Sequence, residues 1–243
     1  QTAMTTNSTA NYIPLNPFTG FDSLDALAVL TVNGLINSKP AQGTLKGLLA
    51  INGARRRVTI SGSLLGEIAA QIGGSVVGLF TPSTVDLYHV PEGAYIVING
   101  FFPVCIKPDA PKAVAVLEEM SPESLLTMLT RSDVARGKFA GQETFNGRPV
   151  NHYIIDGSDF LTAAKKSSDP QLRAFAGGLW SAEDADLYVD AEGIYPVAFH
   201  GAYSGAYEPL KFAGVFEVQI ELTGINTNPL VQLPPSCDKP IAM

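Results

Sequence analysis

One stretch near the C-terminal end, Phe212 to Gly224, constrains the fold more than any other part of the chain. In FAGVFEVQIELTG every second residue from Phe212 onward is apolar or glycine, while Glu217, Gln219 and Glu221 fall between them. Side chains of a strand alternate between the two faces of a sheet. The pattern therefore predicts a β-strand with one apolar face and, over most of its length, one polar face.

A strand of this length implies a large sheet. At about 3.3 Å per residue it would span roughly 40 Å. We expect a strongly curved antiparallel sheet, polar on its convex side, whose concave apolar side needs a cover. The nature of that cover decides the function.

Turn signals divide much of the remaining chain into further strands. Asn-Gly dipeptides, which favour two-residue hairpin turns, occur at 52–53, 99–100 and 146–147. Pro91-Glu92-Gly93 and Ala191-Glu192-Gly193 indicate two more turns. The strands expected around these turns are Thr44–Asn52, Arg55–Ser61, Val85–Val90, Ala94–Asn99, Gly137–Thr144, Arg148–Asp156, Asp184–Asp190 and Ile194–Ser204. A further segment, Ala26–Ile36, is apolar on both faces and fits either a buried strand or a short helix.

Four segments have helical patterns: Ala113–Met120, Pro122–Leu129, Asp159–Lys166 and Gln171–Ala176. Ser121 followed by Pro122 is a helix start signal. An apolar stripe in the last two segments is formed by Phe160, Leu161, Ala164, Leu172, Phe175 and Leu179. Strands and helices in this order predict an α+β fold, mainly β, with helices on one face of an antiparallel sheet.

Ser63 to Phe80 is an apolar segment whose only charged residue is Glu67. Its apolar residues recur at helical spacing up to Gly73-Gly74, and an unbroken apolar run follows. The segment fits a core helix with a buried turn. It also fits a mobile apolar flap, because paired glycines are conformationally permissive.

The composition limits the classes of function. The net charge of -7 argues against nucleic-acid binding, and Arg55-Arg56-Arg57 is interpreted as a solvated strand edge rather than a phosphate site. No apolar run is long enough to span a membrane as a helix. Residues 1–20 are polar and small, which predicts a flexible N-terminal tether downstream of a removed export signal. Residues 21–243 are then expected to form a single domain.

The two cysteines, Cys105 and Cys237, are expected to form one disulfide in an exported chain. Two unpaired buried thiols are the alternative. The chain has no CxxC motif, so redox catalysis is not indicated.

Motifs for catalysis, nucleotide binding and metal binding are not found in the sequence. There is no G-x-S-x-G, GxGxxG or P-loop, and His89, His152 and His200 lie far apart in expected strands. His152 and Asp156, on one strand face, would be about 13 Å apart, too far to share a metal. The sequence predicts a protein that is not an enzyme and has no metal or cofactor.

DADLYVDAEGIYPVAFHGAYSG, residues 184–205, resembles the late hairpin of the LolA-like bacterial envelope lipoproteins, particularly the lipid-carrying LppX/LprG type. NGRPVNHYIIDGSD at 146–159 and the ending VQLPPSC at 231–237 are similar to the same family, as is the long alternating strand. The resemblance covers about residues 21–237.

The resemblance implies a half-barrel whose concave face is covered by helices, with acyl chains of a lipid, glycolipid or lipoprotein held in a hydrophobic cavity between them. It implies lipid transport without catalysis, in the bacterial cell envelope or periplasm. It also implies peripheral contact with the cell membrane, a membrane exporter as a partner, and an N-terminal lipid anchor on a cysteine that this sequence does not contain.

The expected cavity has three parts. Its floor is Phe212, Phe216, Val218 and Ile220; its cover is Leu125, Met128, Leu161, Leu172 and Phe175; its gate is Leu64, Ile68, Ile72, Val77 and Phe80. For each residue, ordinary core packing is the alternative.

Two other functions remain open at this point. One is an envelope sensor or protein-interaction module of the same fold with a closed cavity. The other is a lipid or glycan hydrolase using scattered residues such as Ser75 and His200.

Overall fold

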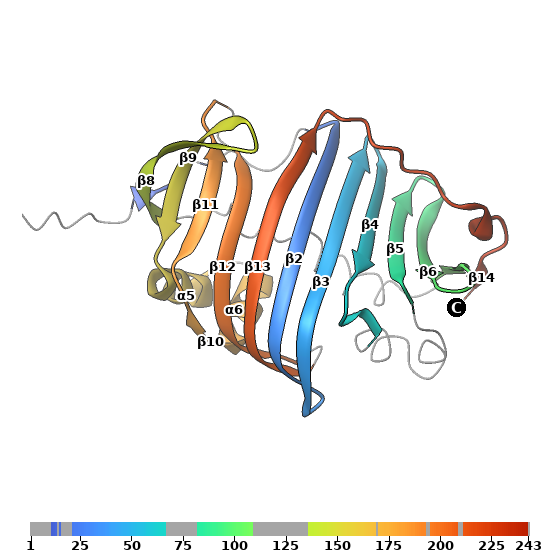
Figure 1. Ribbon diagram of the computed structural model, residues 1–243, viewed down its shortest axis with the longest axis horizontal. Helices are drawn as coiled ribbons and strands as arrows, with labels where there is room; N and C mark the ends of the chain where they lie inside the picture. Colours follow the sequence, from blue (N-terminus) through green and yellow to red (C-terminus); the bar gives the residue numbers. More distant parts are fainter. Residues whose placement is uncertain are drawn as a thin grey trace, which may run out of the picture.

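The computed structural model describes residues 11–13, 15, 21–66, 82–108, 136–168, 170–192, 195–208 and 211–242. Strands predominate within these ranges, and they form one sheet in the order β1-β8-β9-β11-β12-β13-β2-β3-β4-β5-β6-β7-β14, with β10 beside β12 (Figure 1). Described neighbours pair antiparallel except β14, which runs parallel to β7. The predicted class, mainly β with a mostly antiparallel sheet and helices, is confirmed.

The strands on the β1 side of the sheet and the two helices have the following bounds: β1 Asn11–Tyr12, β8 Arg136–Phe145, β9 Arg148–Ile155, β10 Leu179–Ala182, β11 Ala185–Asp190, β12 Pro196–Tyr207, β13 Phe212–Ile225, α5 Gly157–Lys166 and α6 Pro170–Gly178. The remaining elements are β2 Ser23–Ile36, β3 Lys39–Asn52, β4 Arg55–Ser61, β5 Thr84–Val90, β6 Gly93–Asn99, β7 Val104–Lys107, β14 Ile241–Ala242 and a 3-10 helix, η2, Pro235–Asp238.

The long strand β13 has the alternation that the sequence predicts. Val218, Ile220 and Leu222 are buried, while Glu217 and Gln219 between them are exposed. β13 pairs with β12 on one side and with β2 on the other along almost its whole length. Ala26–Ile36 lies within β2, so of the two structures expected for that segment the strand is confirmed.

The expected turns differ in how they form. Asn146 and Gly147 have positive φ angles of 49° and 78° and form the predicted two-residue turn between β8 and β9. Between β3 and β4, however, Asn52 pairs with Arg55, so the turn is Gly53-Ala54, one residue later than predicted. Asn99-Gly100 is not a two-residue turn, because Ile98 pairs with Val104 and five residues lie between them.

Helices α5 and α6 confirm the two later helical predictions and extend them by one to two residues at most ends. Asp156 is the N-cap of α5, and its carboxylate accepts a hydrogen bond from the Asp159 backbone N–H at 2.9 Å. The sequence pattern places Leu179 on the helical stripe. That prediction is wrong, because α6 ends at Gly178 and Leu179 begins β10, which pairs with β12.

Several predictions concern residues outside the described ranges: the helices Ala113–Met120 and Pro122–Leu129, and the segment Ser63–Phe80 beyond Gly66. Within residues 1–20, Asn11 and Tyr12 form β1, which pairs with β8. Ile13 is buried beside Gly137 of β8.

Candidate functional site

One face of the sheet is apolar across most of its width, and we call it the inner face. Residues that are opposite one another in register share a face, so the row Phe199, Ile220, Ala28, Gly47, Ile60, Val85 and Ile98 crosses seven strands. The buried side chains of this face form one continuous hydrophobic cluster from β9 to β5, and Ile96 of β6 packs against it. This is the face for which the sequence predicted a cover.

Helices α5 and α6 lie behind the β10–β13 part of this face (Figure 1). Phe160 of α5 and Phe175 of α6 both contact Tyr203 of β12, with ring centroids 5.7 and 6.0 Å apart. Tyr203 stacks on Phe216 of β13 at 5.4 Å, and Phe216 also contacts Phe212. A ladder of aromatic side chains therefore joins α5 and α6 to β12 and β13.

The ladder contains one hydroxyl group, the phenol of Tyr203. Tyr203 is 5% exposed, and burial raises the pKa of its phenol well above the ordinary value. A tyrosine is neutral at physiological pH even at its ordinary pKa of about 10, so the ladder carries no charge on the inner face.

The predicted cavity residues that lie in the described ranges are found on or next to the inner face. Phe212, Val218 and Ile220 are buried in β13, and Phe216 is partly buried. Leu172 is buried in α6, and Leu161 and Phe175 pack against the same cluster. Leu64 is buried at 2% exposure beside Gly43 of β3. The other predicted residues, Ile68, Ile72, Val77, Phe80, Leu125 and Met128, lie outside the described ranges.

Small residues interrupt the inner face at its lower end. Gly205, Gly214, Gly34 and Ala41 are opposite one another across β12, β13, β2 and β3. A β-carbon on Gly205 would come within 2.7 Å of the Leu179 Cα atom, and one on Gly34 within 2.8 Å of the Gly214 Cα atom. Glycines are therefore needed here because backbone segments approach one another closely.

The opposite, outer face carries a polar cluster that the sequence did not reveal. The two ring nitrogens of His152 in β9 lie 3.0 Å from a Glu143 carboxylate oxygen of β8 and 2.7 Å from an Asp186 oxygen of β11. Tyr188 stacks on His152 with centroids 4.6 Å apart. Burial, followed by the charges of Asp186 and Glu143, raises the pKa of the Tyr188 phenol.

His200 lies at the border of the same cluster. Its ring is 5.8 Å from that of Tyr188 and 6.5 Å from that of Phe145, and its Nε2 atom is 3.8 Å from a Glu221 oxygen. Both clustered histidines thus contact carboxylates and aromatic rings. Within the described ranges no group of three or more His, Cys, Asp or Glu side chains has the arrangement of a metal site.

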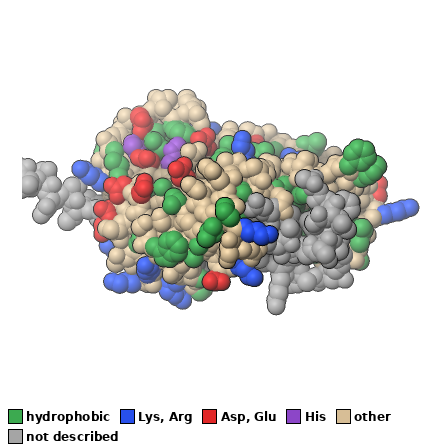
Figure 2. Space-filling model, turned by 60° about the horizontal axis from the view of Figure 1, so that its bottom comes forward, with side chains coloured by type: hydrophobic (Ala, Val, Ile, Leu, Met, Phe, Trp, Pro, Cys, Tyr) green, Lys and Arg blue, Asp and Glu red, His purple; other side chains and the backbone are tan. Residues whose placement is uncertain are grey.

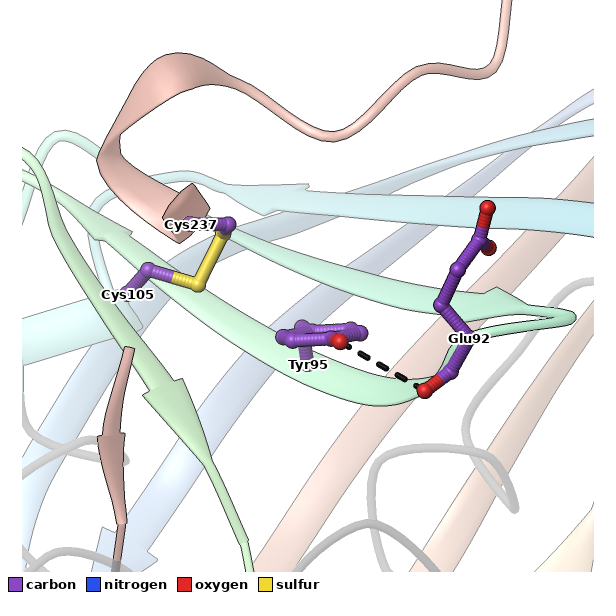
Figure 3. Close-up of a disulfide and its surroundings, with 4 residues drawn as sticks. All are labelled: Glu92, Tyr95, Cys105 and Cys237. Atoms are coloured by element: carbon purple, nitrogen blue, oxygen red, sulfur yellow. Dashed lines mark hydrogen bonds between the residues drawn. A yellow bond between two sulfur atoms is a disulfide. The ribbon is translucent and has the colours of Figure 1, made fainter. Parts of the chain in front are cut away.

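The chain after β13 covers the outer face at the β3–β7 side. Val231 and Cys237 are buried there against Tyr88, Tyr95 and Val97, and form a second hydrophobic cluster. Cys105 of β7 is bonded to Cys237 of η2, which confirms the predicted disulfide (Figure 3). Beneath it, the Tyr95 hydroxyl donates a hydrogen bond to the Glu92 carbonyl at 3.5 Å.

The helices are short. No helix in the described ranges, α5 and α6 included, is long and apolar enough to cross a membrane.

Neither a family model nor a curated protein sequence matches this chain. Three solved structures resemble it with the following values. LprF from Mycobacterium bovis is 9% identical, over 88% of this chain and 90% of that one, with a TM-score of 0.40. A DUF1329 family protein from Desulfovibrio piger is 9% identical, over 86% and 88%, with a TM-score of 0.26. A LolA superfamily protein from Nitrosomonas europaea is 7% identical, over 89% of each chain, with a TM-score of 0.26.

The chain is thus structurally similar to LprF and to a LolA superfamily protein, the group to which the sequence resemblance pointed. TM-scores of this size carry no functional argument, so the function proposed below is argued from the residues of this chain.

Proposed function

We propose that this protein binds the acyl chains of a lipid, glycolipid or lipoprotein between the inner face of its sheet and the segments that cover that face, and carries them across the bacterial cell envelope without catalysis. The observation that carries the proposal is the continuous apolar cluster of the inner face, which extends from β9 to β5. Acyl chains offer no directional bonds, so a carrier binds them by apolar area, at about 25 cal/mol per Å² buried.

The distribution of side-chain size supports the same proposal. α5 contacts β10, and α6 contacts β12, while the apolar cluster continues for several strands beyond them. On those strands Ala26, Ala28 and Ala41 are inward-facing and small. Small side chains on a broad inner face leave volume that other groups must fill. We assign part of that volume to acyl chains.

The proposed site keeps the three parts expected from the sequence. Its floor is Phe212, Phe216, Val218 and Ile220, its cover includes Leu161, Leu172 and Phe175, and its gate begins at Leu64. The glycine row at Gly205, Gly214 and Gly34 supports the curvature of a half-barrel, because glycines inside strands mark bends and close backbone approaches.

The disulfide between Cys105 and Cys237 supports a location outside the cytoplasm, where disulfides form and persist. An N-terminal lipid anchor, the single domain over residues 21–243 and a membrane exporter as partner remain part of the proposal. The anchor and the exporter rest on the family resemblance of the sequence, and the single domain rests on its length and composition.

One observation favours a second candidate function. The ladder of Phe160, Tyr203, Phe175 and Phe216 fills the space between the helices and β12–β13 with aromatic side chains. A closed interior of this kind suits an envelope sensor or protein-interaction module of the same fold.

Native mass spectrometry distinguishes the two functions. Protein purified from a bacterial host is expected to carry diacyl or triacyl lipid that is released on denaturation and identified after organic extraction. A clean apo mass that stays apo after incubation with lipid vesicles would overturn the carrier proposal and favour the closed module.

Variants of β13 test the proposed floor. Val218→Trp, on the inner face, should abolish lipid co-purification, because the larger ring occupies the volume assigned to acyl chains. Its matched control is Gln219→Trp, one residue along the same strand but on the exposed face, which should leave bound lipid unchanged. Equal lipid content in the two folded variants would refute the placement. Circular dichroism establishes that both variants are folded.

A further inference from the structure

The lower end of the sheet in Figure 1 is formed by two contacting hairpin turns. The β2–β3 turn is Asn37-Ser38, and the β12–β13 connection ends at Lys211. The Asn37 backbone N–H donates a hydrogen bond to the Lys211 carbonyl at 3.1 Å. We call this region the hairpin end.

The outer face at the hairpin end carries no charged side chain over two successive rows of paired residues. The row nearer the turns is Ala206, Ala213, Leu35 and Pro40, and the next is Ser204, Val215, Asn33 and Gln42. Leu35 and Val215 are 44% and 46% exposed. An outward-facing strand surface in water is ordinarily polar, whereas these two apolar side chains lie on an uncharged part of it.

The sole tryptophan of the chain borders this surface. Trp180 is 63% exposed and lies in β10, which pairs with β12 at this end. The register shifts between Leu179 and Ser181, so Trp180 is the extra residue of a bulge beside Ser204. A bulge re-aims a side chain. The indole ring here is largely exposed, and the bulge lies beside Ser204, whose partner on β13 is Val215.

The charges at the hairpin end are mainly positive. Lys39 and Lys211 are exposed beside the two turns, together with one exposed acid, Glu208. The first acid on the outer face is Glu217, one row beyond Val215. In Figure 2, which brings the lower end of the molecule toward the viewer, hydrophobic and basic side chains lie around the middle of the view, while most acidic side chains lie higher.

We propose that the hairpin end docks on the surface of an anionic lipid membrane. Trp180, Leu35 and Val215 enter the interface between headgroups and acyl chains, and Lys39 and Lys211 contact headgroup phosphates. Tryptophan is the side chain best suited to such an interface, because its ring is apolar and its N–H still finds a polar partner. Lysines at the surface of an anionic leaflet add electrostatic attraction. The docking rests on the proposed function and deepens it by naming the surface that meets the membrane.

Trp180 makes the proposal directly measurable, since it is the only tryptophan. On mixing the protein with vesicles of phosphatidylcholine and phosphatidylglycerol at about 3:1, the fluorescence emission should shift to the blue, as expected for an indole that enters an apolar interface. Lipids brominated near the headgroup should quench it, and flotation should recover protein with the vesicles. Phosphatidylcholine vesicles alone should bind more weakly. Unchanged Trp180 emission, or the same binding to both vesicles, would overturn the proposal.

Three variants test the named residues by flotation. The double variant Leu35→Ser/Val215→Ser should weaken vesicle binding. The double variant Lys39→Gln/Lys211→Gln should also weaken it, by about fivefold for each lysine removed. The matched control is Leu48→Ser, since Leu48 is an outer-face leucine of β3 that is 50% exposed but lies away from the hairpin end. Weaker vesicle binding by the Leu48→Ser control, or unchanged binding by the two double variants, would refute the assignment.

The docking proposal and the carrier proposal can be refuted independently of each other. Protein that carries lipid but never floats with vesicles defeats the docking proposal alone. Protein that floats with vesicles but is always apo defeats the carrier proposal and leaves a membrane-docked interaction module.

Discussion

Replacing Gly205 by alanine should destabilise the protein, whereas the same change at Gly177 should not. A β-carbon on Gly205 would come within 2.7 Å of the Leu179 Cα atom and also meet the Gly178 carbonyl oxygen. Both are backbone atoms at the junction of α6 and β10, and a backbone cannot rotate away as a side chain can. A β-carbon on Gly177, one position before that junction, would meet no atom within 4 Å apart from its chain neighbours and the backbone of its own helix.

The magnitudes follow from these contacts. Overpacking at a close contact costs about 1–3 kcal/mol. For a chain of this size each kcal/mol corresponds to roughly 2–4 °C in melting temperature, so Gly205→Ala should melt about 2–12 °C lower than the parent protein. Gly177 lies in a helix at ordinary backbone angles, and alanine there should stabilise by up to about 1 kcal/mol.

Equilibrium unfolding in urea, followed by circular dichroism, measures both free energies. The two variants add the same methyl group at sites that are close in space, so the difference in sign isolates the close approach of α6 and β10 to β12. A neutral Gly205→Ala, or equal destabilisation by both changes, would refute the argument that the helical layer rests directly on β12 here.

Two further predictions concern stability. Asp156→Ala should cost about 1 kcal/mol by removing the N-cap of α5. The Ser158 hydroxyl and the Asp159 N–H donate hydrogen bonds to the Asp156 carboxylate and lower its pKa. The carboxylate should therefore stabilise the fold fully above its unfolded-state pKa, and this stabilisation should be lost as pH falls through the lower folded-state pKa. Asp156→Asn keeps an acceptor and should lack that pH dependence in urea titrations between about pH 2 and 6; an identical pH dependence in the variant and the parent would contradict this. Reducing the Cys105–Cys237 disulfide, which closes a loop with a sequence separation of 132, should lower the free energy of unfolding by up to about 5 kcal/mol, measured with and without reductant; an unchanged unfolding midpoint would show that the pairing contributes no stability.

Local patterns in the sequence predicted those parts of the fold that depend on local chemistry. The alternation from Phe212 onward placed β13 almost to the residue, and Asn146-Gly147 fixed a turn whose angles only small or Asn-like residues adopt readily. The turn at 53–54 was missed by one position because Gly53 alone supplies the positive φ there, so the preceding Asn52 belongs to the strand.

Features that depend on strand order were not predictable in the same way. Leu179 continues the helical apolar stripe in sequence, yet its pairing with Gly205 makes it part of a strand. His152 meets Glu143 and Asp186 only because β9 lies between β8 and β11. Nothing in the sequence gives that order, and sequence spacing relates His152 only to Asp156 on the same strand.

The apolar floor of the candidate site was readable in β13, because a single strand shows its two faces by alternation. The hairpin-end surface was not, since its residues come from β12, β13, β2 and β3 and are brought together by register. Trp180 was also missed, because a bulge interrupts the period on which such predictions rest.

The pairing of β13 with β2 has a consequence for how the chain reaches its native state. Residues 30 and 218 are partners in the middle of the sheet, so the first and last long strands must find each other across almost the whole length of the polypeptide. Contacts this distant in sequence slow folding, because the entropy of closing the loop is lost before the pairing is gained. During synthesis β2 has no neighbour on one side until β13 has emerged. Until β13 emerges, this edge of β2 therefore stays exposed to chaperones and to other chains.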